Sequence, residues 1–243
     1  MSKKVVKKTT TVTTEVTENS VGEKTQIVCI LDRSGSMESI IGDAIGGFNE
    51  FIKEQKKLED EASMTVALFD DRYDLLYDNI PIKEVKDFDR STWSPRGLTA
   101  LYDAIGKTVN TVKQTHKNLK KKERPDKVLV CIVTDGMENH SKEYTQSQIQ
   151  DLIKECEKEH DWAFIYLAAN QDAFAAGTSF GISGGNTYTF TADGAGMENV
   201  SATLTNAATY YRNASRDDVD FNANSTNLMD SFGEKDEDEE VKQ

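Results

Sequence analysis

The sequence contains little proline, cysteine and histidine, with three residues of each in a chain of 243. The scarcity of proline, together with only 15 glycines and no internal repeat, excludes collagen-like and low-complexity chains. The number of cysteines is odd and none of them lies in a Cys-x-x-Cys pair, so the pattern does not indicate a disulfide framework. We therefore expect Cys29, Cys131 and Cys156 to be free thiols in a reducing compartment.

The sequence also lacks long apolar runs and an excess of positive charge. No stretch of about 18 apolar residues predicts a membrane span, and the opening MSKKVVKKTTTVTTEV lacks the apolar core of a secretory signal. We therefore expect a cytoplasmic protein. The 29 Lys and Arg against 42 Asp and Glu give a net charge of −13, which argues against nucleic acid or an anionic membrane as a partner bound by charge.

The two ends of the chain differ in composition from its middle. Residues 1–24 are rich in Lys, Thr, Val and Glu, and we expect them to form a flexible arm. Residues 215–243 include the block EKDEDEEVK, with six acidic and two basic side chains, and we expect an acidic, disordered tail. Residues 25–214 remain as one domain of ordinary size.

Within this domain, short apolar runs alternate with helical patterns. The runs at 26–31, 64–69, 127–133 and 162–168 are continuous, which favours strands of a parallel sheet covered on both faces. Apolar residues recur three or four positions apart over 37–52, 101–112 and 149–156, which predicts helices, the first beginning near Met37. Residues 72–80 predict a strand antiparallel to 64–69. We therefore predict an α/β fold: a mostly parallel central sheet with one antiparallel edge strand and helices on both faces.

Oxygen-bearing side chains follow two of the predicted strands and precede the second helix. Asp32, Ser34 and Ser36 follow the first strand, Asp135 follows the strand at 127–133, and Thr99 comes just before the helix at 101–112. Because ligands of open α/β sheets gather at the carboxyl ends of the strands, we expect these five side chains to converge. With no His or Cys near them in sequence, the set favours Mg²⁺ over zinc or copper, and Mn²⁺ or Ca²⁺ stays open.

The motifs Asp32-Arg33-Ser34-Gly35-Ser36, Gly-Leu-Thr99 and Thr134-Asp135-Gly136 resemble those of the von Willebrand factor A (vWA) domain, whose metal-ion-dependent adhesion site is written DxSxS, then Thr, then Asp. The resemblance covers about residues 25–212. It implies a Rossmann-like six-stranded sheet with Mg²⁺ at its top and protein binding through the metal. It further implies that Ser34, Ser36 and Thr99 are direct ligands, with Asp32 and Asp135 binding directly or through water. The DRSGSM opening and TDGMEN resemble compact bacterial and phage members.

Simpler interpretations of these residues compete with a metal site. Asp32 and Ser34 could cap the helix near Met37 and Thr99 could cap the next one, although capping leaves Asp135 unexplained. Trp93 could form an aromatic rim with Tyr102, or lie buried beneath the loop at 88–96. The histidines, of which only His140 lies near the motifs in sequence, are better explained as solvated surface residues than as general bases.

These patterns predict a Mg²⁺-dependent protein-binding module that captures an Asp or Glu of a partner protein, and not an enzyme. An aspartyl phosphotransferase typically carries a second acid two residues after its nucleophile, where this chain has Ser34. Two other functions stay open. The protein could be an assembly component of a phage particle, and then virion-associated, or of a tellurite-resistance-like stress complex. Alternatively, it could be an adaptor for a MoxR-type AAA+ ATPase.

Overall fold

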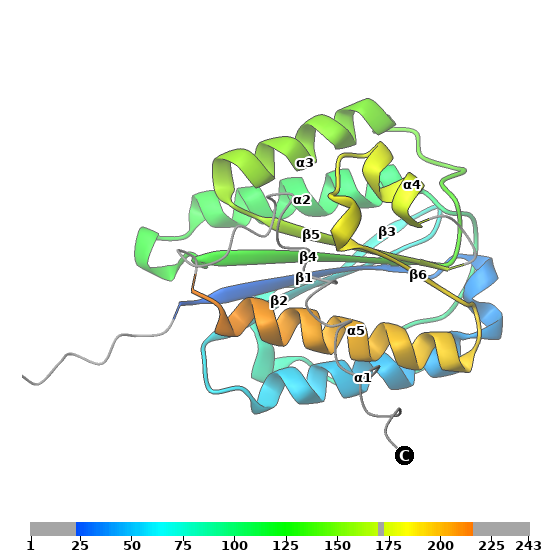
Figure 1. Ribbon diagram of the computed structural model, residues 1–243, viewed down its shortest axis with the longest axis horizontal. Helices are drawn as coiled ribbons and strands as arrows, with labels where there is room; N and C mark the ends of the chain where they lie inside the picture. Colours follow the sequence, from blue (N-terminus) through cyan, green and yellow to red (C-terminus); the bar gives the residue numbers. More distant parts are fainter. Residues whose placement is uncertain (1–22, 170–172, 216–243) are drawn as a thin grey trace, which may run out of the picture.

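The computed structural model describes residues 23–169 and 173–215 of the chain, and these form a six-stranded sheet between two layers of helices (Figure 1). The strand order is β3-β2-β1-β4-β5-β6. The strands are β1 Thr25–Asp32, β2 Ala62–Phe69, β3 Tyr73–Pro81, β4 Lys127–Thr134, β5 Ala163–Ala169 and β6 Thr187–Phe190. The predicted arm and tail fall almost entirely outside the described residues.

The pairing of the strands confirms the predicted sheet. β1 lies at the centre, parallel to β2 and β4, and β5 and β6 continue the parallel arrangement. β3 runs antiparallel to β2 at one edge. The four apolar runs become β1, β2, β4 and β5, and most of their residues are buried because helices cover both faces. β6 has no counterpart among the predicted strands, since it is four residues long and reads Thr-Tyr-Thr-Phe.

Helices α1 and α5 cover one face of the sheet, and α2, α3 and α4 cover the other (Figure 1). Their bounds are α1 Ile41–Lys57, α2 Leu101–Asn118, α3 Gln146–His160, α4 Ala173–Ser179 and α5 Gly194–Asn213. The start predicted for the first helix is wrong. Residues Gly35–Ser39 form a 3-10 turn, η1, and α1 begins only at Ile41. The tighter turn lets the chain leave β1 with Ser34 and Ser36 facing the end of β4.

Helix α5 runs back along the sheet and ends beside the start of β4. Lys127, the first residue of β4, is buried, and its Nζ donates hydrogen bonds to the carbonyl oxygens of Tyr211, Arg212 and Ala214 at 2.9, 2.9 and 2.6 Å. The end of α5 is therefore anchored at the amino edge of the sheet, opposite the carboxyl ends of β1 and β4. Among the described helices, none is both long and apolar enough to cross a membrane.

Candidate metal centre

The ends of β1 and β4 bring the two carboxylates of the predicted site, Asp32 and Asp135, to the same edge of the sheet. The two strands are adjacent and in register up to Leu31 and Val133, so Asp32 ends β1 beside Thr134, the last residue of β4. The Thr134 hydroxyl donates to Asp32 Oδ2 at 2.5 Å, and the Ser34 backbone N–H donates to Asp32 Oδ1 at 2.6 Å. Asp32 is 0% exposed, so it forms the floor of the centre.

The two serines link this floor to Asp135. Ser34 Oγ lies 3.0 Å from Ser36 Oγ, and Ser36 Oγ donates to Asp135 Oδ1 at 2.7 Å. Ser34 is buried, whereas Ser36 is exposed and Asp135 half-buried. The group is therefore closed towards the sheet and open towards solvent.

Thr99 reaches the same place from the loop before α2. A Cβ atom added to Gly136 would lie 2.9 Å from Thr99 Oγ1 and 3.6 Å from Ser36 Oγ, so the threonine hydroxyl lies against the glycine that follows Asp135. The main chain secures this position. Thr99 N–H donates to Asn139 Oδ1 at 2.9 Å, and Thr99 O accepts from the N–H groups of Asn139 and His140 at 3.0 and 3.2 Å.

The electrostatics of the centre fit a cation. Burial raises the pKa of Asp32 to about 6, although hydrogen bonds from Thr134 and Ser34 act to lower it. Burial also raises the pKa of Asp135, against hydrogen bonds from Ser36 and Ser34. One buried and one half-buried carboxylate thus lie in the same group, where a positive charge would stabilise their ionised form. The donors are all oxygen, two of them charged, which suits a hard divalent ion such as Mg²⁺.

A buried ion-pair network beside the centre was not predicted from the sequence. Asp70 is 0% exposed, and its Oδ2 accepts hydrogen bonds from Arg33 Nε at 3.0 Å and from Arg96 Nε at 2.6 Å. Arg33 also pairs with Asp74 at 2.5 Å. The main chain adds bonds from Ala100 N–H to Asp70 O and from Arg96 N–H to Arg33 O. Asp70 therefore ties the loop after β1 to the loop that carries Thr99.

The sequence position of Asp70 could have indicated that it lies near the centre, because it follows an apolar strand in the same way as Asp32 and Asp135 do. The pattern at Asp70 and Asp71 predicts a turn, and the structure does turn there, between β2 and β3. The sequence gives no indication that two arginines from other loops converge on one oxygen of Asp70.

Two further carboxylates attach the loop after Asp135 to the start of α2. Glu138 accepts from the N–H groups of Tyr102, His140 and Ser141 at 3.0, 2.8 and 2.7 Å. Asp103 accepts from the N–H groups of residues 142, 143 and 144 at 3.0, 2.9 and 2.9 Å. Burial alone would raise the pKa of Asp103, but these N–H groups lower it below its ordinary value. The loop after Asp135 is thus bonded both to Thr99 and to the first turn of α2.

Helix capping does not explain the motif residues. Ser34 precedes η1 without a side-chain capping bond, and the residue that caps α2 is Ala100, not Thr99. Trp93 is 1% exposed and its indole N–H donates to Asp32 O at 3.0 Å, so the structure places it behind the centre and not on its rim. Tyr102 packs edge-on against Phe180.

One histidine departs from the expected solvated surface position. His116 is half-buried, with its Nε2 2.5 Å from Gln26 Oε1 and its ring edge-on to Trp162. Burial lowers the pKa of His116 to about 4. The ring lies near the start of β1, at the end of the strand away from Asp32, and takes no part in the centre.

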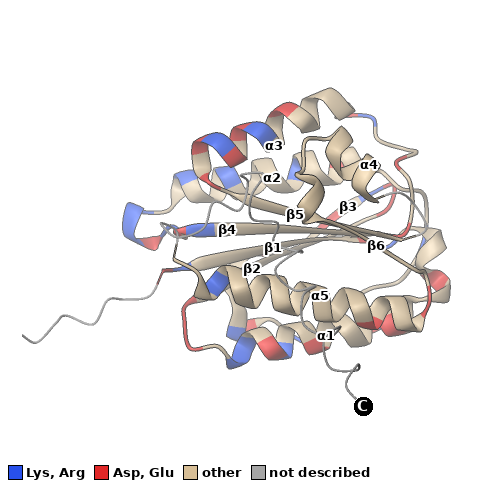
Figure 2. Cartoon of the chain, viewed as in Figure 1, with Lys and Arg blue, Asp and Glu red and all other residues tan. Residues whose placement is uncertain are grey.

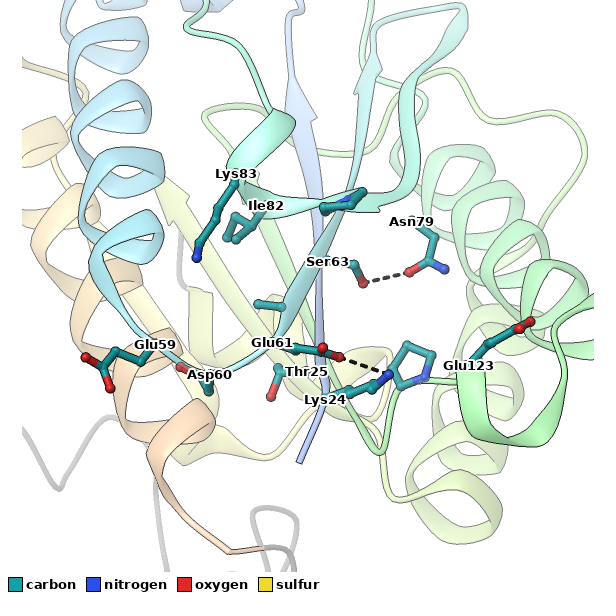
Figure 3. Close-up of a pocket in the computed structure, with 13 residues that line it drawn as sticks. Lys24, Thr25, Glu59, Asp60, Glu61, Ser63, Asn79, Ile82, Lys83 and Glu123 are labelled. Atoms are coloured by element: carbon teal, nitrogen blue, oxygen red, sulfur yellow. Dashed lines mark hydrogen bonds and ion pairs between the residues drawn. The ribbon is translucent and has the colours of Figure 1, made fainter. Parts of the chain in front are cut away.

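A separate pocket of about 390 Å³ lies at the opposite edge of the sheet (Figure 3). Thr25, the first residue of β1, lies in its lining, so the pocket is about 23 Å from Asp32 along an eight-residue strand. Several polar groups of the lining satisfy one another: Lys24 pairs with Glu61 at 2.9 Å, and Ser63 donates to Asn79 at 2.6 Å. The pocket therefore belongs to a different surface from the metal centre.

Solved structures share this fold at low sequence identity. Proximal thread matrix protein 1 from the mussel byssus matches 76% of this chain and 46% of its own, with a TM-score of 0.56 and 14% identity. A von Willebrand factor type A structure from Catenulispora acidiphila matches 76% and 43%, with a TM-score of 0.51 and 13% identity. The PilB minor pilin from Streptococcus sanguinis matches 79% and 62%, with a TM-score of 0.54 and 10% identity.

These matches establish the fold of the described residues as the Rossmann-like vWA fold. The chain spans less than two thirds of the length of each of the three proteins. The mussel protein has also been solved with zinc in its metal-ion-dependent adhesion site. No family model and no curated protein matches the sequence.

Proposed function

We propose that this chain is a metal-dependent protein-binding module that captures a carboxylate of a partner protein at the centre formed by Asp32, Ser34, Ser36, Thr99 and Asp135. The observation that carries the proposal is the convergence of these oxygens, from three separate loops, on one solvent-facing place. The hydroxyls of Ser34, Ser36 and Thr99 would hold Mg²⁺ directly, and Asp32 and Asp135 would hold it directly or through water. Bound Mg²⁺ supplies an electrophilic position for an anionic oxygen.

The charges around the centre support capture through a metal. Two carboxylates at most neutralise a divalent ion, and the three hydroxyls add no charge, so the centre retains attraction for one further anion. Three arginines of the neighbouring loops are already paired. Arg33 and Arg96 bind Asp70 and Asp74, and Arg90 binds Glu38. Figure 2 shows Lys and Arg gathered instead at the end of the molecule away from the centre, around the end of α2 and the 3-10 turn Lys121–Glu123. A partner's carboxylate would therefore depend on the metal.

The hydrogen bonds of the loops suggest how capture could change the protein. Thr99 is bonded to Asn139 and His140, and Glu138 is bonded to Tyr102. A shift of Thr99 towards a newly bound carboxylate would carry the loop of Asp135 with it, so the two loops would respond as one unit.

The same geometry favours binding over catalysis. Aspartyl phosphotransferases typically place a second acid two residues after the nucleophile, to protonate the leaving group or activate water. Here that position is Ser34, whose hydroxyl faces Ser36. We therefore propose no reaction at Asp32.

Titration calorimetry with Mg²⁺ tests the centre. Asp32→Ala and Thr99→Ala should each weaken Mg²⁺ binding more than about tenfold, because each removes an oxygen from the proposed coordination shell or its support. Asp151→Ala, an exposed acid on α3, is the matched control and should bind as the parent does. If the first two variants also bind as the parent does, the centre is wrongly assigned. Repeating the titration with Mn²⁺ and Ca²⁺ decides which ion binds best.

Affinity capture read by mass spectrometry tests the binding function. Partner proteins should be recovered in Mg²⁺, lost in EDTA and lost with Asp32→Ala even in Mg²⁺. Recovery that EDTA leaves unchanged would contradict a bridging metal.

A further inference from the structure

Two exposed apolar side chains flank the metal centre. Among the described residues, four large hydrophobic side chains are exposed: Leu75, Leu98, Met137 and Phe174. Leu98, 49% exposed, precedes Thr99, and Met137, 71% exposed, follows Gly136. We call this pair the apolar border. Because both side chains are exposed next to residues of the centre, a segment that binds there can bury them.

A segment of this chain outside the described residues has the matching chemistry. Residues 228–232 read Leu-Met-Asp-Ser-Phe, so Asp230 is a carboxylate with large apolar neighbours on both sides. Asp230 is also the only charged residue within 221–233, although the chain is strongly acidic on either side of that stretch. A lone carboxylate can approach the centre without the repulsion that an acidic block would meet from the surrounding acids.

The length of the chain allows Asp230 to reach the centre easily, whereas the acids nearer to α5 could approach it only with a fully extended chain. The anchored end of α5 lies at the start of β4, and the seven steps from Lys127 to Thr134 span about 23 Å to the carboxyl edge. From Ala214, the six residues to Asp220 span at most about 22 Å, and the sixteen residues to Asp230 at most about 58 Å. Asp230 is therefore the first acid with apolar neighbours that can reach the centre from its own α5 without a fully extended chain.

We propose that Asp230 occupies the carboxylate position of the metal-loaded centre within its own chain, while Leu228, Met229 and Phe232 contact the apolar border. A partner would then have to displace residues 228–232 before it could bind. The inference rests on the proposed function, because Asp230 would bind at the centre as a ligand of the metal.

Paramagnetic broadening by Mn²⁺ in ¹H–¹⁵N spectra of the full chain tests this proposal. One equivalent of Mn²⁺ should remove the amide signals of Gly136 and of residues 228–232, and leave that of Val219. Asp230→Asn should restore the signals of 228–232 while that of Gly136 remains lost. Asp220→Asn, the matched acid in the same segment, should change nothing. Leu98→Ser combined with Met137→Ser should weaken the effect on 228–232, whereas Leu75→Ser on β3 should not.

Each other outcome overturns one specific claim. If Mn²⁺ broadens Gly136 but not 228–232, the self-capture is wrong and the metal centre stands. If broadening of 228–232 persists in Asp32→Ala, the ion is bound to the acidic residues 234–242 and the self-capture is again wrong. If Gly136 is unaffected in the parent chain, the proposed function fails. Broadening that disappears on dilution would mean capture by a second copy and would contradict binding within one chain.

Discussion

At the scale of the residue, Gly136 shows how closely the centre is packed. It follows Asp135 directly, and its lack of a side chain leaves the space that Thr99 Oγ1 occupies, 2.9 Å from where a Cβ would be. That distance is shorter than a carbon and an oxygen tolerate without displacement. The glycine is therefore needed for space.

This contact predicts the effect of Gly136→Ala. The added methyl group should push Thr99 away from the serines and weaken Mg²⁺ binding about tenfold or more, since displacing one ligand's support costs of that order. Calorimetric titration measures it. Gly46→Ala is the control, because nothing lies within 4 Å of a Cβ at Gly46. In the interior of α1 it should leave metal binding unchanged and raise the free energy of unfolding by up to about 1 kcal/mol. Equal Mg²⁺ affinities for both variants would contradict the packing described here.

At the scale of the element, the centre depends on how three loops are held. The loops come from the ends of β1 and β4 and from the start of α2, and buried or half-buried carboxylates join them. Asp70 binds both Arg33 and Arg96, and Glu138 and Asp103 bind the N–H groups of neighbouring loops. The ligands are therefore positioned by a polar framework that contains none of the motif oxygens.

Asp70→Asn should weaken this framework. It leaves the buried Arg33 with only Asp74, whose side chain is half exposed, as a charged partner, so the variant should lose up to about 3 kcal/mol of unfolding free energy. Because Thr99 follows the loop that Arg96 holds, Mg²⁺ affinity should fall as well. Urea unfolding and calorimetry measure the two effects. Asp74→Asn belongs to the same network but is 49% exposed at its side chain, and it should cost less than about 1 kcal/mol. If Asp74→Asn lowers the unfolding free energy as much as Asp70→Asn does, Asp70 is not the residue that holds the two loops together.

At the scale of the whole molecule, the two edges of the sheet have different characters. The carboxyl edge carries the metal centre, and the amino edge carries the anchored end of α5 and the half-buried His116. The unfolded pKa of a histidine, 6.5, exceeds the pKa of about 4 that burial gives His116. Between pH 6.5 and 4 the unfolded chain therefore binds the proton more readily, so His116 destabilises the fold as the pH falls through that window.

His116→Gln should flatten this part of the pH dependence. Between pH 7 and 4.5 the unfolding free energy of the parent should fall by about 2 kcal/mol more than that of the variant. This is less than the full pKa shift of His116 would give, because the ring keeps some solvent contact. Urea unfolding at the two pH values measures it. The comparison of the two proteins is needed because burial raises the pKa of Glu157 to about 7, which acts in the opposite direction. Parallel pH profiles would show that His116 is freely protonated in the folded protein.

The sequence by itself determined the layers of this protein and the oxygens of its candidate centre. Continuous apolar runs must be covered on both faces, which leads to a parallel sheet, and residues that follow such strands must meet at one edge. The short polar strand β6 escaped prediction because four residues carry too little pattern. Only the tertiary structure decided that Thr99 lies against Gly136, that Trp93 lies behind Asp32, and that Asp70 joins two loops. These contacts join residues far apart in the chain. Their energies depend on how deeply the residues are buried and on which loops meet, and a local sequence pattern contains no information on either.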